Sequence, residues 1–335
     1  MHSRRESRTP GQPVGSYSSP SSVNTSAAYR QNYQWPRVDT TTQQVQRGLT
    51  RQDFSLQTDI VGPVVAKIWD TPGGTFSERM KHVIEPTFSV AYVTQIDPQR
   101  VATVTPLTGS HASTRLTYGL TNRLFARAPS VGEIRGGTRE FLTVSVQQTY
   151  YSDPTASRND TTYISAAGRP APVDLSPIAL VTRFSPRDGF DANGRIEYDV
   201  TGNGFQVFTM GGTFAAAGPT LAGTSANVSF SRQRFRPSGP VSSYLSGSTS
   251  MRLMQGRTST FYILNWDIDA GYIHSQSLGA TYLAQCCGVQ ADFQTVNLPP
   301  ALRSTIVRDR RFNFAFVLAG LGTFSNFFGL FGGQQ

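Results

Sequence analysis

Short runs in which apolar and polar residues alternate recur from Gln52 onward. Clusters of Gly, Pro, Asn, Asp and Ser separate these runs, as expected for strands joined by turns. The alternation has a period of two, which places apolar side chains on one face of a strand and polar side chains on the other. Good amphipathic helices are absent from this pattern. The sequence therefore predicts an all-β chain with antiparallel strands.

The clearest alternation lies in Phe141–Tyr151, Phe261–Ile273 and Arg311–Leu318. In each segment nearly every second residue is aliphatic or aromatic, and the residues between them are mostly polar or small. The same pattern, less regular, recurs in further segments. These further candidate strands are Asp53–Val61, Val83–Thr94, Thr114–Arg127, Ile178–Ser185, Arg195–Val200, Phe205–Phe214, Ser225–Phe235, Leu245–Leu253, Leu278–Leu283 and Gly288–Val296.

The segment Phe261–Ile273 favours a membrane-spanning strand. Tyr262 and Tyr272 stand at the two ends of an apolar stripe, and Asp267 and Asp269 lie on the opposite face. A strand that crosses a membrane needs about 9–11 residues, and aromatic residues prefer the two water–lipid boundaries. A soluble β-sandwich would show the same alternation, but its strands are usually about 5–6 residues long.

We therefore predict an antiparallel outer-membrane β-barrel portion over residues 51–335. Roughly a dozen strands are expected, which either close alone or form the second half of a larger barrel, since such barrels have even strand numbers from about 8 upward. Residues 1–50 are rich in Ser, Thr, Pro, Gln and Arg, and we expect them to be disordered or to lie outside the barrel.

The net charge of +9 comes almost entirely from arginine, because Lys67 and Lys81 are the only lysines. Arginine binds phosphate in a forked geometry, which suits an anionic glycolipid or a nucleic acid. Ordinary solvated loops explain the same composition. No recognition helix or compact basic motif is present, so nucleic acid is not predicted as a partner. No apolar run is long enough for a transmembrane helix.

The residues that carry chemistry are few. The two cysteines, Cys286 and Cys287, are adjacent, and there is no CxxC motif or histidine cluster that would predict a metal site. Free cysteine behaves as a small hydrophobic residue, so two small buried residues without a chemical function are one interpretation of this pair. The four histidines lie in no nucleophile motif and GxSxG is absent, so we predict no enzyme activity and no cofactor.

Three alternating arginines, Arg232, Arg234 and Arg236, lie on the side of a strand that continues from Val228 and Phe230. A charge at the middle of a bilayer costs a barrel about 2–4 kcal/mol and much less near the interface. We therefore expect these arginines to lie beyond the membrane edge. They are candidates for contacts with glycolipid phosphates, and an exposed loop stem is the alternative.

Several short motifs resemble the lipopolysaccharide-assembly (LptD) family, also called organic-solvent-tolerance proteins. His82–Pro86 reads HVIEP, Tyr118–Leu124 reads YGLTNRL and Ser145–Tyr151 reads SVQQTYY. Ser176-Pro177 precedes an apolar strand, as it does in that family. Their order and spacing are similar to the barrel part of the family.

The strongest part of the resemblance lies near the end of the chain. Cys286-Cys287-Gly288 is followed, after a gap, by the aromatic-rich segment Arg311–Gly322. The family similarly ends with a strand that carries two adjacent cysteines and a last strand of this kind. The resemblance covers about residues 50–330.

The resemblance implies a function in the outer membrane of a Gram-negative bacterium. Members of this family receive lipopolysaccharide from a periplasmic transport bridge and release it into the outer leaflet through a lateral opening between the first and last strands. This implies a lateral-gate or last-strand role for Phe312, Phe314, Phe316 and Leu318. No bond is made or broken. The alternative is a general porin or another outer-membrane transport barrel.

The resemblance also implies partners. A lipoprotein similar to LptE plugs the lumen, the barrel-insertion machinery reads an aromatic-rich last strand, and the transport bridge docks on an N-terminal periplasmic jellyroll. Cys286 and Cys287 would pair with cysteines of that N-terminal domain. The family barrel has about twice the strands counted here. Since no apolar signal-peptide segment is visible in residues 1–30, we expect this chain to be a piece of a longer protein.

Overall fold

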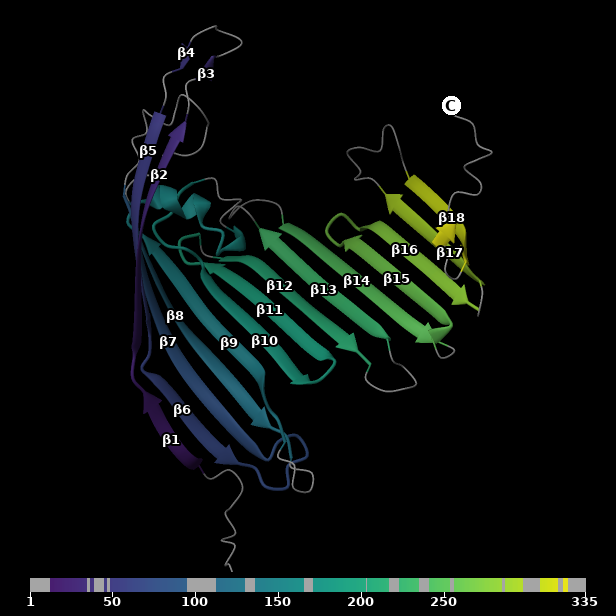
Figure 1. Cartoon of the computed structure of the whole chain (residues 1–335), viewed down its shortest axis with the longest axis horizontal. Coiled ribbons are helices and arrows are strands. Elements are labelled where there is room, and N and C mark those ends of the chain that lie inside the picture. Colours follow the sequence, from purple (N-terminus) through teal and green to yellow (C-terminus); the bar gives the residue numbers. More distant parts are fainter. Residues whose placement is uncertain are drawn as a thin grey trace, which may run out of the picture. The chain divides into compact units, whose positions relative to one another are not determined.

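The structure is a computed structural model of the whole chain, and its strands are drawn in Figure 1. The structure describes the placement of fourteen stretches of the chain. These are 13–34, 37–38, 45–46, 49–94, 113–129, 136–165, 171–202, 204–216, 223–234, 241–253, 256–284, 287–297, 308–318 and 322–324.

The described residues form an all-β protein with antiparallel pairing, as the alternation predicts. A single 17-stranded sheet holds all the strands except the short pair β3 (Arg37–Val38) and β4 (Val45–Gln46). The described residues include the 3-10 helix η1 (Pro154–Asn159). No helix in the described part of the chain is long and apolar enough to cross a membrane.

The chain divides into two compact units. Unit 1 comprises Met1–Arg183, Arg195–Val207 and Phe235–Gly239, and unit 2 comprises Phe184–Gly194, Phe208–Arg234 and Pro240–Gln335. The strands β10 (Ile178–Arg187), β11 (Phe190–Asp199) and β12 (Gly204–Ala215) contribute residues to both.

Unit 1 begins with strands that the sequence did not predict. β1 (Pro13–Ser19) pairs with β6 (Val64–Asp70), and β2 (Ser22–Gln34) pairs with β5 (Leu49–Val61). The expectation that residues 1–50 lie outside the sheet is therefore wrong for these strands. β2 is rich in Ser, Thr, Asn and Gln, and its place in the sheet rests on backbone hydrogen bonds to β5, which do not depend on side-chain polarity.

The rest of unit 1 is built around three long strands. β7 (Arg79–Val93), β8 (Ser113–Arg127) and β9 (Thr138–Tyr151) lie side by side in antiparallel order (Figure 1). β6 pairs with the first half of β7, and β5 pairs with the second half. β5 and β6 therefore act together as one long strand against β7, with the Gly62-Pro63 peptide between them.

The register of unit 1 separates its two faces. Phe88 of β7 lies opposite Tyr118 of β8, and Leu120 of β8 lies opposite Val146 of β9. These side chains are exposed, and they lie on the same, mainly apolar face of the sheet. Other exposed residues of this face are Val23, Tyr29, Phe54, Leu56, Tyr92 and Tyr150. The opposite face carries Arg, Glu, Asp, Ser and Thr.

Unit 2 repeats the two-faced pattern with β13 (Ser225–Arg234), β14 (Val241–Leu253), β15 (Thr258–Asp267), β16 (Tyr272–Leu283), β17 (Cys287–Asn297), β18 (Arg308–Leu318) and β19 (Gly322–Phe324). Each of these strands pairs with the next. One face carries Tyr262, Leu278, Phe293 and Phe312, which the register places in a row across four strands. All four are exposed.

A glycine on the polar face of unit 2 accommodates a large ring. Gly279 of β16 lies opposite Phe261 of β15. A Cβ atom added at Gly279 would overlap the ring of Phe261. The absence of a side chain at this position therefore makes room for an aromatic residue among hydroxyl and amide neighbours.

The predicted strand Phe261–Ile273 is wrong, because this segment is a hairpin. β15 ends at Asp267 and β16 starts at Tyr272. The carboxylate of Asp267 accepts a hydrogen bond from the amide of Ala270 at 2.9 Å, and Gly271 has a φ of +68°. These are turn features, since glycine adopts a positive φ without steric cost. Tyr272 consequently lies opposite Asp267, and the two tyrosines do not mark the ends of one strand.

The number of strands is also larger than the predicted dozen. The other predicted strands correspond to observed ones, with boundaries that differ by a few residues. The additional strands are β1 to β4 in the polar N-terminal segment, β6, and β19 after the last predicted strand. Short or polar strands carry too few apolar positions for a period of two to be recognised.

Candidate functional site

The polar face of unit 1 carries a series of ion pairs. Arg123 of β8 lies between two carboxylates, with its Nε 3.1 Å from Glu85 of β7 and its Nη1 3.6 Å from Glu140 of β9. Towards one end of the same strands, Arg79 pairs with Asp70 at 2.6 Å and Arg127 pairs with Glu78 at 2.7 Å. Charges on this face are thus matched across neighbouring strands.

The segment between β9 and β10 packs against this polar face. Both of its ends are fixed to β9. The amide of Tyr151 donates to the carbonyl of Asp174 at 2.7 Å, and the amide of Ser176 donates to the carbonyl of Thr149 at 2.8 Å. We call the described residues of this connection, 152–165 and 171–177, the inner segment. It begins with η1, where the carboxylate of Asp153 accepts a hydrogen bond from the amide of Thr155.

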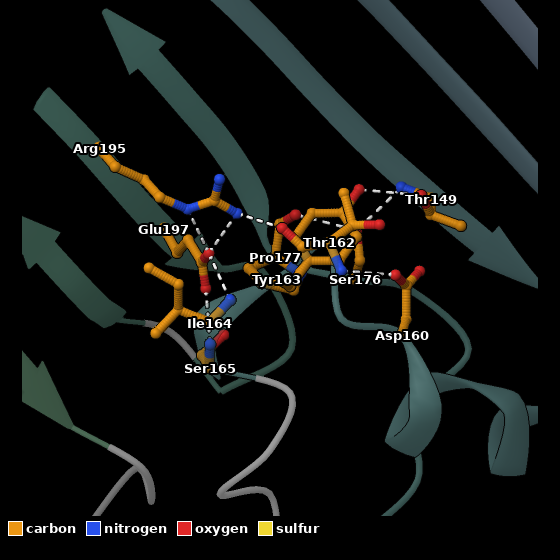
Figure 2. A network of polar contacts seen from close by, with 10 residues as sticks. All are labelled: Thr149, Asp160, Thr162, Tyr163, Ile164, Ser165, Ser176, Pro177, Arg195 and Glu197. Carbon is orange, nitrogen blue, oxygen red and sulfur yellow. Dashed lines mark hydrogen bonds and ion pairs between the residues drawn. The ribbon is translucent and has the colours of Figure 1, made fainter. Parts of the chain in front are cut away.

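Glu197 of β11 is the most buried charge that holds the inner segment. Its side chain is fully buried, and its two carboxylate oxygens accept hydrogen bonds from the amides of Ile164 at 2.8 Å and Ser165 at 2.9 Å. Arg195 donates to the same carboxylate from Nε at 2.7 Å and lies 2.6 Å from it through Nη2 (Figure 2). A buried carboxylate is tolerated only when it is paired and hydrogen-bonded in this way.

A second buried group lies around Tyr163 of the inner segment. Its hydroxyl is 2.9 Å from the hydroxyl of Thr149, which in turn is 2.8 Å from that of Thr117. Figure 2 shows Tyr163 between Thr149 and the Glu197 group. Burial raises the pKa of Tyr163, hydrogen bonds from Ser176 and Thr149 oppose that rise, and the charges of Asp160 and Glu197 add to it.

Asp160 anchors the start of the inner segment. Its carboxylate accepts hydrogen bonds from the hydroxyl of Tyr151 at 2.6 Å and from the amide of Thr162 at 2.9 Å. Burial raises the pKa of Asp160, but the hydrogen bonds from Thr162 and Tyr151 and the guanidinium of Arg115, 3.6 Å away, outweigh it. The resulting pKa lies below the ordinary value for a carboxyl group.

The side-chain contacts on the polar face of unit 2 differ from those of unit 1. In unit 2, cross-strand contacts are made mainly by hydroxyl and amide groups, such as Ser229 with Ser246 at 2.8 Å and Asn265 with Ser275 at 2.9 Å. Asp292 accepts a hydrogen bond from Asn313 at 2.8 Å. The same face also carries an ion pair within β18, between Arg311 and Asp309 at 2.6 Å.

The residues predicted from the sequence as sites are scattered. Phe312, Phe314 and Phe316 of β18 are exposed on the apolar face, and Leu318 belongs to the same strand. Cys287 is exposed at the start of β17, whereas Cys286 lies outside the described residues. The predicted disulfide is therefore not tested.

The arginine stripe is described only in part. Arg232 and Arg234 close β13, where they lie opposite Ser243 and Val241 on the side that continues from Phe230. This agrees with the predicted alternation. Arg236 lies outside the described residues.

The sequence pattern does not predict the inner segment, although it includes Ser176-Pro177. The signal that could have indicated it is the length of the connection between β9 and β10. A connection of this size between two strands is uncommon unless it carries a function or a structure of its own. Its Asp-Pro start and its isolated Tyr163 indicated a capped turn and a buried ring, but nothing local indicated Glu197 as their partner.

Comparison with known proteins identifies no family for this chain. No protein-family model matches the sequence, and no curated protein matches it.

Proposed function

We propose that this chain is a transmembrane portion of an outer-membrane β-barrel, with its apolar face toward lipid and its polar face toward a water-filled lumen. The observation that carries the proposal is the exposure of many large apolar side chains on one face of each unit. Soluble proteins rarely expose apolar patches beyond a few hundred Å². Closure of the sheet and insertion into a membrane are parts of this proposal.

The backbone hydrogen bonds of a membrane-spanning sheet set a condition for this proposal. In a bilayer, backbone groups without hydrogen-bond partners cost several kcal/mol each, so a sheet can cross a membrane only if it is closed. Closure of the sheet, which this proposal includes, would pair its outermost strands and meet this requirement.

The proposed membrane face is tested by introducing charges. Leu278→Arg places a charge on an exposed apolar position of β16, and Ser277→Arg places it on the neighbouring polar position. We expect Leu278→Arg to lower the free energy of unfolding from vesicles by about 2–4 kcal/mol, and Ser277→Arg to have a much smaller effect. Equal effects at the two positions would contradict the assignment of the faces.

Within this class, we propose lipopolysaccharide transport to the outer leaflet as the function. The resemblance of His82–Pro86, Tyr118–Leu124 and Cys286–Gly288 to the lipopolysaccharide-assembly family supports it. The polar face of unit 1 carries several arginines, a residue type that binds phosphate in a forked geometry. The lateral gate, the lumen plug and the periplasmic bridge implied by that family are parts of the same proposal.

A photocrosslinking amino acid tests the substrate. It is placed at Gln147 on the polar face of β9 or at Val146 on the apolar face, in cells that make lipopolysaccharide. We expect crosslinked glycolipid from position 147 and much less from position 146. No crosslink from any polar-face position would argue against this substrate.

A general transport channel is the second candidate. The hydroxyl- and amide-rich face of unit 2 favours it, because such a surface is wetted without selecting a charge. Planar-bilayer conductance separates the two. A steady open channel favours the porin-like alternative, whereas a closed barrel that still crosslinks lipopolysaccharide favours the transporter.

A further inference from the structure

The two lysines of the chain lie close together in sequence but on opposite faces of unit 1. Lys67 of β6 lies opposite His82 of β7, two positions from the pair Val65–Ile84, so it belongs to the apolar face. Lys81 shares the polar face, where its ammonium lies 5.3 Å from the ring centre of Tyr17 and 5.7 Å from that of Phe125. A lysine on a mainly apolar face requires an explanation.

Lys67 is part of a compact group with two rings. Its Nζ lies 5.5 Å from the ring centre of Trp69, and Trp69 stacks on His82 with ring centres 6.4 Å apart and an interplanar angle of 16°. His82 Nε2 is 3.3 Å from Oδ1 of Asn122. Lys67 is exposed, and no carboxylate among the described residues pairs with it.

The group lies at the end of unit 1 where most connections are shorter. Residues 71–78 and 128–137 join strands at this end. The segments 35–48, 94–112 and 152–177 and the four-residue connection 200–203 join them at the other end. Outer-membrane barrels have short turns on the periplasmic side and longer loops outside. The group therefore belongs at the periplasmic boundary, where the leaflet consists of phospholipid.

Tryptophan and lysine are the residues expected at such a boundary. The indole ring occupies the headgroup level, and a lysine near the edge of the membrane extends its ammonium towards water and phosphate. A free ammonium beside a half-buried indole and an imidazole offers both a charge and a hydrogen-bond donor to a phosphodiester.

We propose that Lys67, Trp69 and His82 form a binding site for the phosphate headgroup of an anionic phospholipid in the periplasmic leaflet. The site rests on the proposed membrane function of the chain. Lys67 supplies the charge, Trp69 packs against the glycerol and upper acyl region, and His82 positions the indole ring from the neighbouring strand. The site lies on the apolar face of unit 1, opposite the polar face that the proposal assigns to glycolipid.

The experiment uses Trp69 as its own probe. The substitutions Trp35→Phe and Trp266→Phe leave Trp69 as the only tryptophan of the full chain. This protein is folded into phosphatidylcholine vesicles that contain brominated phosphatidylcholine or brominated phosphatidylglycerol, and quenching of Trp69 gives the relative affinity of the two lipids. We expect phosphatidylglycerol to be preferred about fivefold, as expected for one lysine at an anionic surface.

Lys67→Gln is expected to reduce this preference to nearly onefold, while quenching by brominated phosphatidylcholine persists. Lys81→Gln is the matched control, because it removes the other lysine from the opposite face, and it should leave the preference unchanged. Inorganic phosphate at millimolar concentration should not compete. Competition by phosphate would overturn the lipid assignment in favour of a general phosphate site.

The remaining outcomes separate this site from the function on which it rests. If both brominated lipids quench Trp69 equally, the headgroup site is wrong while contact of this face with lipid stands. If neither lipid quenches Trp69, the membrane proposal fails, and the headgroup site fails with it.

Discussion

The polar faces of the two units differ in the partners that their buried and half-buried polar side chains find. Unit 1 uses ion pairs and a packed inner segment, with Glu197 fully buried beside Arg195. Unit 2 uses hydroxyl and amide pairs such as Ser229 with Ser246, and no inner segment packs on its described residues. The difference teaches that one alternating pattern supports both a face with cross-strand ion pairs and a packed segment, and a face linked mainly by hydroxyl and amide groups.

The largest test of this contrast is Glu197→Ala. It leaves the guanidinium of Arg195 and two amides without their acceptor in a buried place, so we expect a loss of about 3–5 kcal/mol in the local stability of the inner segment. Hydrogen exchange at the amides of Ile164 and Ser165 measures this loss. Glu85→Ala is the control, since its ion pair with Arg123 is partly exposed and should cost about 1 kcal/mol or less.

An unchanged exchange rate at these amides after Glu197→Ala would mean that other contacts hold the inner segment. In that case the contrast between the units would rest on packing rather than on charge.

Much of this arrangement could be predicted from the sequence. The long strands β7, β8, β9 and β18 were found because their apolar positions alternate over many residues. The hairpin at Asp267–Gly271 was missed, because Ile268 and Ala270 happen to continue the apolar stripe through a turn. The alternation favours a continuous strand there, but the hydrogen bond to Asp267 and the positive φ of Gly271 produce a turn.

The buried network could not be predicted, because it depends on residues that are distant in the sequence. Glu197 reads as one of several polar positions in β11, and only the fold brings it to the amides of Ile164 and Ser165. Alternation identifies the face on which a residue lies, but it does not identify the segment that packs against that face.

A second test uses pH. The pKa of Asp160 is lower in the folded protein than in the unfolded chain, so its carboxylate stabilises the inner segment above the ordinary carboxyl value of about 3.9 and loses this effect as the pH falls below it. The raised pKa of Tyr163 acts in the opposite range, since its contribution is lost as the pH rises above about 10.

Hydrogen exchange across this range should therefore show the inner segment loosening first in acid and again in strong alkali, while the amides around Ser229 and Ser246 change little. Asp160→Asn should remove most of the acid step. An acid transition of equal size around Ser229 and Ser246 would contradict the contrast between the two units.

The smallest expected effect is in unit 2. Ser246→Ala removes one hydroxyl from a partly exposed pair with Ser229, so we expect a cost of about 0.5–1 kcal/mol in the free energy of unfolding. Urea unfolding in vesicles measures it. The double variant Ser229→Ala with Ser246→Ala should cost less than the sum of the two single variants, because the second change leaves no hydroxyl unpaired. A larger, additive cost would indicate that each serine has a separate partner.

The ring of Phe261 over Gly279 has a consequence for how this sequence can diverge. A side chain gained at position 279 meets an occupied space, so it becomes acceptable only together with a smaller residue at position 261. We therefore expect these two positions to vary as a linked pair in related sequences, with glycine kept wherever the aromatic ring is kept. Such coupled inheritance would record the pairing of β15 with β16 without any structure being determined.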